Sequence, residues 1–276
     1  MTHDPKDALQ DARRRLDIAG SPSPARDASA LVDLVQRGAP SWTPLTDDQM
    51  AHLQRLVDRR ARREPISHIT GKRAFWMHDF QVTGDVLDPR PDTETLVETA
   101  LTHAFDTVLD LGTGSGCILL SLLHERPGAC GLGTDVSDAA LAVARRNAAT
   151  VGVSNRADWR VSDWFSDVTG TFDLIVSNPP YIAESEMPDL APELAYEPRG
   201  ALTDEGDGLS AYREITASAP RFLAPNGRLM VEIGPTQARD VTAFFHAAGL
   251  ENVTTHPDLD GRDRVISGAF LPQTDV

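Results

Sequence analysis

Lysine is almost missing from this chain of 276 residues, whose only lysines are Lys6 and Lys72. Its 26 basic residues are outnumbered by 41 acidic ones, and the formal net charge is −15. Such a chain repels the phosphate backbone of nucleic acids unless its basic residues are concentrated on one face. The composition therefore argues against a nucleic-acid substrate.

Cysteine is also scarce, and Cys117 and Cys130 form neither a disulfide framework nor a metal-ligand spacing. The eight histidines are scattered without paired spacing, so we predict no metal site. No apolar run approaches the length of a membrane span, and the polar, charged start is unlike a secretory signal. We expect a cytoplasmic protein that acts without metal or membrane.

Residues 1–74 are predicted to form a small helical domain. Gly or Pro bounds each of three short amphipathic patterns, DALQDARRRLDIAG, SPSPARDASALVDLVQRG and DDQMAHLQRLVDRRARREP. Aromatic and β-branched residues in turn-rich surroundings follow, which predicts a hairpin linker over residues 75–90. We assign the helical domain to substrate recognition, with simple capping of a catalytic sheet as the alternative.

Residues 91–276 are predicted to form an α/β domain. From residue 107 onward, apolar strand-like runs alternate with helical patterns, which indicates a doubly wound parallel sheet. The last two of seven strand-like runs, NVTTHPD and DRVISGAFL, are separated only by LDGR. So short a link cannot make a parallel crossover, and the terminal strand is therefore expected to pair antiparallel.

A glycine-rich turn, DLGTGSG, ends the first strand of this domain and opens a helix. Gly112, Gly114 and Gly116 allow a tight turn and a close approach to a ligand, a weak signal that dinucleotide dehydrogenases share. Asp135 closes the second strand, where a carboxylate can accept the hydroxyls of a ribose. Asp163 and Trp164 end the third strand, where an adenine could be hydrogen-bonded and stacked.

The segment SNPPYI follows the buried-strand pattern FDLIV, and its two prolines must end the strand. The Asn178 side-chain oxygen and the Pro179 carbonyl can each accept one N–H of a planar amide or arylamine. This arrangement orients the nitrogen toward a methyl donor. The prolines fix the direction of the carbonyl, and Tyr181 can stack on the planar group. The segment favours methyl transfer to a planar nitrogen by positioning, without a strong base.

Together, DLGTGSG, GTDVS and NPPY resemble the class I S-adenosyl-methionine-dependent methyltransferases that modify planar nitrogens. NPPY alone is shared with adenine-N6 DNA and RNA methyltransferases. The flanking segments are similar to the glutamine-N5 methyltransferases of peptide-chain release factors (the PrmC/HemK family): PISHITGKRAFW, VLDPRPDTETLVE, LAYEPRGAL, VEIGPTQ and DLDGRDRVISG. The resemblance covers nearly the whole chain from about residue 64.

This resemblance implies an S-adenosyl-methionine-dependent enzyme that methylates the glutamine of the Gly-Gly-Gln loop in class 1 release factors. The glutamine amide would enter a pocket lined by Asn178, Pro179, Pro180 and Tyr181, with no nucleic acid or membrane as partner. Asp110 would orient the glycine turn from behind. The residues implied for the cofactor are Gly112, Thr113, Gly114, Ser115, Gly116, Asp135, Trp164 and Asn178.

Three features of the sequence leave alternatives open. A glutamine methyltransferase of a ribosomal protein would share the same motifs, and an adenine-N6 nucleic-acid methyltransferase would share NPPY. Asp88 before PRP and the turn TDEGDG depart from the family pattern near the expected substrate entrance. The basic cluster Arg59–Arg63 is either a solvated helix end or a docking patch for an acidic face of the protein substrate.

Overall fold

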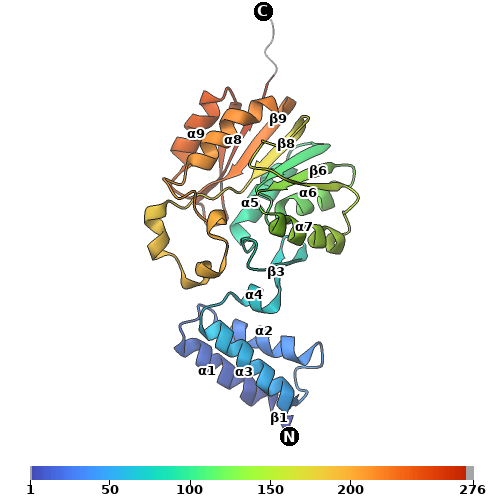
Figure 1. Ribbon diagram of the computed structural model, residues 1–276, viewed down its shortest axis with the longest axis vertical. Coiled ribbons are helices and arrows are strands. Elements are labelled where there is room, and N and C mark those ends of the chain that lie inside the picture. The colour runs from blue at the N-terminus through green and yellow to red at the C-terminus, as the bar shows by residue number, and fades with distance from the viewer. Residues whose placement is uncertain (1, 272–276) are drawn as a thin grey trace, which may run out of the picture. The chain divides into compact units, whose positions relative to one another are not determined.

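The structure, a computed structural model, describes residues 2–271, and these divide into two compact units. One, called the helical unit below, comprises Met1–Lys72 and Ala191–Tyr196. The other, called the sheet unit, comprises Arg73–Leu190 and Glu197–Val276. Each unit is described by itself (Figure 1).

The helical unit is built on three amphipathic helices and a short fourth one. Their apolar faces form one core that includes Leu16, Leu31 and Leu53. Thr46 and Gln49 form a reciprocal capping box at the start of the third helix, and Asp47 and Asp48 lie in its first turn. The helices are α1 Pro5–Ile18, α2 Pro24–Gln36, α3 Asp47–Ala61 and α4 Ile66–Thr70, and β1 Thr2–His3 pairs with β2 Leu45–Thr46.

The segment Ala191–Tyr196 joins this unit although it lies far along the chain, after the NPPY motif. The Glu193 carboxylate accepts hydrogen bonds from Arg60 at 3.0 Å and from Arg63 at 2.7 and 2.8 Å. Burial alone would raise the pKa of Glu193, but the bonds from Arg63 and Arg60 lower it below its usual value. An ionic network thus ties this segment to α3.

Arg60 shows that the basic cluster is neither a solvated helix end nor, as a whole, a docking patch. Its side chain is 5% exposed and donates to Asp27 at 2.7 Å and to Ser21 at 3.2 Å, in addition to Glu193. Arg59 pairs with Glu64. The prediction of a cluster open to partners is wrong for Arg60, because buried carboxylates on two other segments take up its charge.

The sheet unit contains one seven-stranded sheet in the order β10-β11-β9-β8-β5-β6-β7. Only β11 runs antiparallel to its neighbours, β9 and β10, so the predicted doubly wound sheet with an antiparallel terminal strand is confirmed. The strand order changes direction between β5 and β8, where such folds bind their ligands. The strands are β5 Thr107–Leu111, β6 Cys130–Asp135, β7 Ala157–Val161, β8 Phe172–Ser177, β9 Leu223–Glu232, β10 Glu251–Pro257 and β11 Asp263–Ala269.

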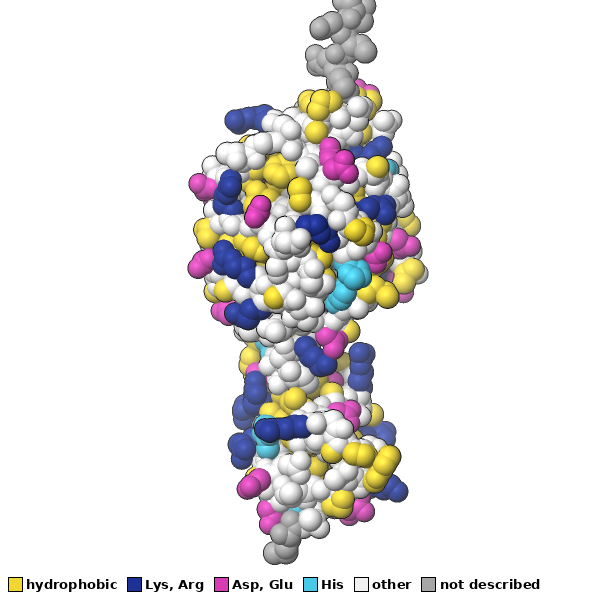
Figure 2. All heavy atoms as spheres, turned by 90° about the vertical axis from the view of Figure 1, so that its right-hand side faces the viewer, with side chains coloured by type: hydrophobic (Ala, Val, Ile, Leu, Met, Phe, Trp, Pro, Cys, Tyr) yellow, Lys and Arg dark blue, Asp and Glu magenta, His cyan; other side chains and the backbone are white. Residues whose placement is uncertain are grey.

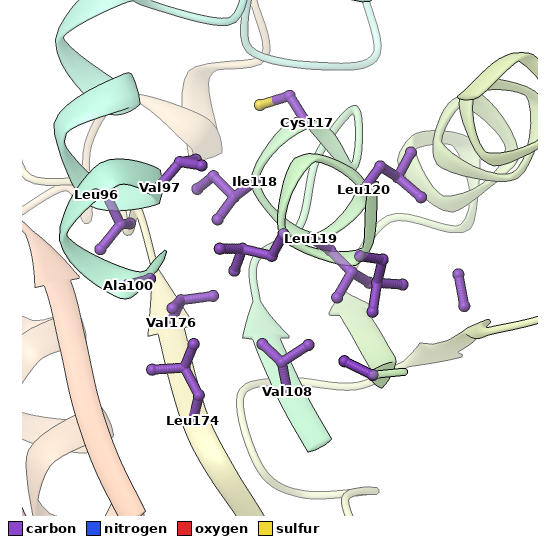
Figure 3. Packing of buried hydrophobic residues seen from close by; sticks show 14 of the residues in the cluster. Leu96, Val97, Ala100, Val108, Cys117, Ile118, Leu119, Leu120, Leu174 and Val176 are labelled. Atoms are coloured by element: carbon purple, nitrogen blue, oxygen red, sulfur yellow. The ribbon is translucent and has the colours of Figure 1, made fainter. Parts of the chain in front are cut away.

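Helices cover both faces of the sheet, as Figure 1 shows. Val108, Leu174 and Val176 point to the face covered by α5 and α6, where they pack against Leu96 and Ile118 (Figure 3). Their neighbours along the strands pack against α8 and α9 on the other face. The helices are α5 Glu94–Leu101, α6 Cys117–Glu125, α7 Asp138–Val151, α8 Ser210–Ser218 and α9 Ala238–Ala247.

The remaining elements are a hairpin and short 3-10 turns. β3 Lys72–Phe75 pairs with β4 His78–Gln81, and Trp76 at the turn has a positive φ of 52°. α8 ends at Ser218, earlier than its sequence pattern predicts, because Pro220 has no N–H to donate to the preceding turn. In residues 2–271 no helix is long and apolar enough to cross a membrane. The 3-10 turns are η1 Pro91–Thr93, η2 Glu184–Asp189, η3 Pro192–Tyr196, η4 Arg199–Ala201 and η5 Ala219–Arg221.

Candidate active site

The glycine turn and the NPPY segment leave adjacent strands at the same edge of the sheet. Leu111 of β5 is in register with Ser177 of β8, and the Ser177 hydroxyl donates to the Leu111 carbonyl at 2.8 Å. Both strands run parallel, so their carboxyl ends meet there. The structure therefore brings together the two motifs that the sequence analysis singled out.

The glycine turn adopts a backbone that needs glycine. Gly112, Gly114 and Gly116 have φ values of 68°, 54° and 80°, in the left-handed region that other residues rarely adopt. A Cβ on Gly114 would meet no atom within 4 Å, so the turn faces open space there. Gly116 caps the N-terminus of α6. An open glycine turn at a helix start is suited to close approach by a ligand.

Asp135 holds the glycine turn to the end of β6. Its carboxylate accepts one hydrogen bond from the Gly114 N–H and one from the Ser137 N–H, both at 2.9 Å. Burial raises the pKa of Asp135, and these backbone donors oppose that shift. Each carboxylate oxygen has a second lone pair, so the group can still accept hydroxyl donors.

Asp110 lies beneath the same turn and is fully buried. The Thr113 hydroxyl donates to its Oδ2 at 2.6 Å, which supports the predicted role of Asp110 in orienting the turn. Its Oδ1 has no hydrogen-bond partner among the described residues. Burial raises the pKa of Asp110 to about 7, partly offset by the Thr113 bond. The Leu119 N–H of α6 also acts on this carboxyl and opposes the effect of burial, so Asp110 links the turn to the start of α6.

Trp164, predicted to lie beside the adenine, is close to the glycine turn. Its ring carbon would be 3.8 Å from a Cβ on Gly112, and its backbone φ of 46° is left-handed. The Ser162 hydroxyl donates to the Trp164 carbonyl at 2.8 Å and fixes that unusual backbone. Val136, which follows Asp135, is 67% exposed and is a further apolar side chain at this edge. The sequence analysis missed it because one valine at a strand end carries no signal by itself.

A cavity of about 910 Å³ opens between the Trp164 loop and the NPPY segment. Of the predicted site residues, Trp164 and Pro180 line it, whereas the glycine turn, Asp135 and Asn178 do not. The other lining residues are Asp163, Phe165, Ser166, Val168, Gly200, Thr203, Asp204, Ser210, Ala211, Glu214, Ser218, Arg221 and Phe222.

Asn178 has a defined orientation at the end of β8. Its Nδ2 donates to the Thr93 hydroxyl oxygen at 3.2 Å. The amide oxygen, Oδ1, is therefore the end of the side chain that can accept an N–H from a substrate. Pro179 is buried behind it, whereas Asn178, Pro180 and Tyr181 are half-buried. The Asn178 Oδ1 and the Pro179 carbonyl stay the predicted acceptors, and the hydrogen bond to Thr93 is compatible with this role for Asn178.

Tyr181 is held in place by Gln237, a residue to which the sequence analysis gave no role. Gln237 Nε2 donates to the Tyr181 carbonyl at 2.9 Å and to the Gly208 carbonyl at 3.1 Å. Burial raises the pKa of the Tyr181 phenol to about 12, so the ring stays neutral. Gln237 belongs to VEIGPTQ, but nothing local to that segment reveals its partner.

Asp88, one of the two departures from the family pattern, is buried beside cationic groups. Its Oδ2 lies 3.7 Å from the Arg73 guanidinium and 3.9 Å from that of Arg90. Arg90 also donates to Glu197 at 2.6 Å. The positive charges of the two arginines offset the cost of burying the Asp88 carboxylate, which stands where the family has an apolar side chain.

Family comparisons define the class of protein first. Residues 85–209 match the methyltransferase small domain, and residues 7–71 match the PrmC N-terminal domain. A crystal structure of a methyltransferase from Pyrococcus furiosus superimposes with a TM-score of 0.56 at 16% identity, covering 78% of this chain and 99% of that one. The fold is that of a methyltransferase.

Full-length relatives then define the family. The release factor glutamine methyltransferase of Cereibacter sphaeroides is 51% identical over 273 residues, covering 96% of this chain and 98% of the relative. That of Caulobacter vibrioides is 44% identical, covering 95% and 94%. The chain belongs to the family of release factor glutamine methyltransferases.

Proposed function

We propose that this enzyme methylates the side-chain amide nitrogen (N5) of the glutamine in the Gly-Gly-Gln loop of class 1 peptide chain release factors. One observation carries the proposal: Asn178 presents an amide acceptor beside the glycine turn, in a chain whose full-length relatives are named for this reaction. The release factors act in translation, so the enzyme would work in the cytoplasm.

The methyl donor we propose is S-adenosyl-L-methionine, and the residues at the sheet edge fit it. The open side of Gly114 leaves room for its chain, and Asp110 holds the turn from beneath through the Thr113 hydroxyl. The Asp135 carboxylate would hold the ribose, with Trp164 beside the adenine. When bound, this molecule supplies an electrophilic methyl group on a sulfonium.

Asn178 and Pro179 would do the positioning in this reaction. The Asn178 Oδ1 and the Pro179 carbonyl would each accept one N–H of the substrate amide. The two hydrogen bonds would hold the amide plane so that the nitrogen lone pair, perpendicular to that plane, points at the methyl group. Tyr181 stacks on the planar amide and excludes water from one side. The new N–C bond would form as the methyl–sulfur bond of the sulfonium breaks, which leaves S-adenosyl-homocysteine as a neutral thioether. The nitrogen would release one proton to water, so no strong base is needed.

The helical unit would grip the protein surface around the glutamine. The glutamine lies in a loop of a large protein, so the enzyme needs contacts beyond the amide, and the helical unit contains no residue of the methyl-transfer site. This assignment makes residues 1–74 a substrate-recognition domain. Residues 75–90 would form the hairpin linker, and residues 91–276 the catalytic domain.

The charge distribution disfavours a nucleic-acid substrate for the same site. On the face that Figure 2 shows, basic side chains are separated by acidic, apolar and uncharged ones rather than joined in one basic surface. A nucleic-acid methyltransferase needs a concentrated basic face to offset a net charge of −15.

Methylation of purified substrates with labelled S-adenosyl-methionine tests the proposal. Peptide mass spectrometry is expected to find one methyl group on the glutamine of the Gly-Gly-Gln loop. A release factor with that glutamine changed to alanine is the matched control and should take up no label. Label in ribosomal proteins and not in release factors would instead support the sister glutamine methyltransferase.

A further inference from the structure

Glu232 is a buried carboxyl group that accepts no well-formed hydrogen bond. It ends β9, is 1% exposed, and neither carboxylate oxygen accepts a hydrogen bond of ordinary geometry from the described residues. Burying such a group costs free energy unless another part of the protein offsets it. The methyl-transfer scheme above makes no use of this residue, so its position needs another reason.

Glu232 is the neighbour of Asn178 across the sheet. Ser177 of β8 is in register with Val231 of β9; Asn178 follows directly after the end of β8, and Glu232 is the last residue of β9. Val176 and Met230 both point to the face covered by α5, and because side chains alternate along a strand, Glu232 shares that face. The Asn178 side chain reaches the same face, since its Nδ2 donates to Thr93 at the start of α5.

Thr93 lies between these two groups at the start of α5. It is 2% exposed, and its oxygen accepts the hydrogen bond from Asn178 Nδ2. Burial raises the pKa of Glu232 to about 7, and the Thr93 hydroxyl partly offsets this effect by donating toward the carboxylate. A threonine hydroxyl has one hydrogen, so it can donate to only one of its two neighbours.

We propose that Thr93 and Glu232 are positioning residues that fix which end of the Asn178 amide faces the substrate. With the hydroxyl hydrogen directed at Glu232, the Thr93 oxygen can only accept from Asn178. The NH2 end of Asn178 is then held toward Thr93, and Oδ1 toward the substrate. This inference rests on the proposed function, because only an amide substrate requires an acceptor there.

The orientation matters because an asparagine amide has nearly the same shape when its two ends are exchanged. In the flipped state, the Thr93 hydroxyl would donate to Oδ1 and the NH2 group would face the substrate. An N–H facing the N–H of a glutamine amide repels it, so the flipped enzyme would bind cofactor but not orient the nitrogen. A buried acceptor for the Thr93 hydrogen removes this second state.

The arginines near Glu232 donate their hydrogen bonds to other groups. The charged or titratable groups that act on Glu232 from the neighbouring elements are Arg264, Arg90, Asp92, Tyr181, Tyr212 and Cys117. Arg90 donates to Glu197. Arg264 lies in β11, but its guanidinium donates to the Ile233 carbonyl, Asp92 and Asp258. None of these hydrogen bonds goes to a Glu232 oxygen.

Removal of the Thr93 hydroxyl tests the proposal. Thr93→Val is expected to lower kcat about tenfold or more, with S-adenosyl-methionine affinity and KM for the release factor within about twofold of wild type. Thr93→Ser keeps the hydroxyl and is expected to restore kcat. Thr99→Val is the matched control, since that buried hydroxyl on the same helix donates only to the Thr95 carbonyl at 2.7 Å.

The double variant tests whether Glu232 acts through Thr93. Glu232→Gln alone is expected to lower kcat several-fold. The double variant, Thr93→Val with Glu232→Gln, is expected to have the same kcat as Thr93→Val alone. If the two losses in kcat multiply in the double variant, Glu232 does not act through Thr93 and the proposal is overturned. A Thr93→Val enzyme as active as Thr99→Val would also overturn it.

A readout without turnover separates this inference from the proposed function. The NMR signal of the Asn178 side-chain NH2, identified by its loss in Asn178→Asp, is expected to shift in Thr93→Val and to stay in Thr93→Ser. An unshifted signal in Thr93→Val would overturn the inference. A wild-type enzyme that methylates no release factor while this signal behaves as expected would overturn the proposed function alone.

Discussion

Gly208 lies directly against the carbonyl of Tyr181, and a Cβ on Gly208 would come within 2.3 Å of that oxygen. Its φ of 73° is left-handed, so any other residue would be strained there as well. The turn TDEGDG, which departs from the family pattern, therefore packs against the back of NPPY. The Gln237 side chain donates to the carbonyls of Tyr181 and Gly208 and so links the turn to the NPPY segment.

Gly208→Ala is expected to displace the Tyr181 carbonyl and lower kcat/KM for the release factor by about tenfold to a hundredfold, since small displacements of positioning groups are costly. The matched control is Gly206→Ala in the same turn, where a Cβ would meet only the Asp204 carboxylate at 3.5 Å. Steady-state kinetics of both variants provide the measurement. Equal activities would contradict the supporting role of this turn.

Gly114→Ala is expected to weaken S-adenosyl-methionine binding about tenfold or more, because the added methyl group enters the open space over the turn. Gly152→Ala is the control for backbone strain, since Gly152 has a φ of 82° and equally open surroundings at the end of α7. Isothermal titration calorimetry distinguishes the two. Unchanged affinity in Gly114→Ala would refute the glycine turn as the cofactor site, and NAD binding by wild type would indicate a dehydrogenase.

Asn178→Ala is expected to lower turnover by about a hundredfold or more, comparable with removal of an oxyanion-hole donor. The loss should appear mainly in kcat, because the Asn178 acceptor acts on the reacting nitrogen. Single-turnover kinetics with saturating release factor measure this step. Near wild-type turnover would show that the amide acceptor is not part of the mechanism.

The parts of the fold that depend on local pattern were predictable from the sequence. Apolar periodicity indicates the strands, and the short LDGR link indicates that β11 is antiparallel. The glycine turn and NPPY were predictable as neighbours because parallel strands bring their carboxyl ends together.

The supporting residues were not predictable, because their roles come from tertiary neighbours distant in sequence. Thr93 and Glu232 meet Asn178 only when α5 covers the junction of β8 and β9. Glu193 joins the helical unit through arginines that lie more than a hundred residues earlier in the chain. Charge patterning treats Arg60 as surface, since it cannot reveal the buried Asp27 opposite.

Arg60→Met is expected to destabilise the helical unit by about 3–5 kcal/mol, because it leaves the buried Asp27 carboxylate without its cation. Arg59→Met is the matched control, with an expected cost below about 1 kcal/mol, since its pair with Glu64 is partly solvated. Urea unfolding followed by circular dichroism measures both. Equal, small losses would mean that the Arg60 network contributes nothing beyond a surface pair.

The stability of the enzyme is expected to depend on pH through Glu232, whose pKa burial raises to about 7 in the folded state. In the unfolded chain this carboxyl has an ordinary pKa and releases its proton at lower pH. Between these two values the folded state binds more protons, so stability falls as pH rises. Wild type is therefore expected to lose up to about 3 kcal/mol relative to Glu232→Gln between about pH 4.5 and pH 7. Urea unfolding of both proteins across this range measures the difference, and Glu98→Gln, at an exposed carboxyl on α5, controls for the substitution itself. A difference that stays constant with pH would show that Glu232 is ionised throughout, held by a cation such as Arg264 instead of by the Thr93 hydroxyl.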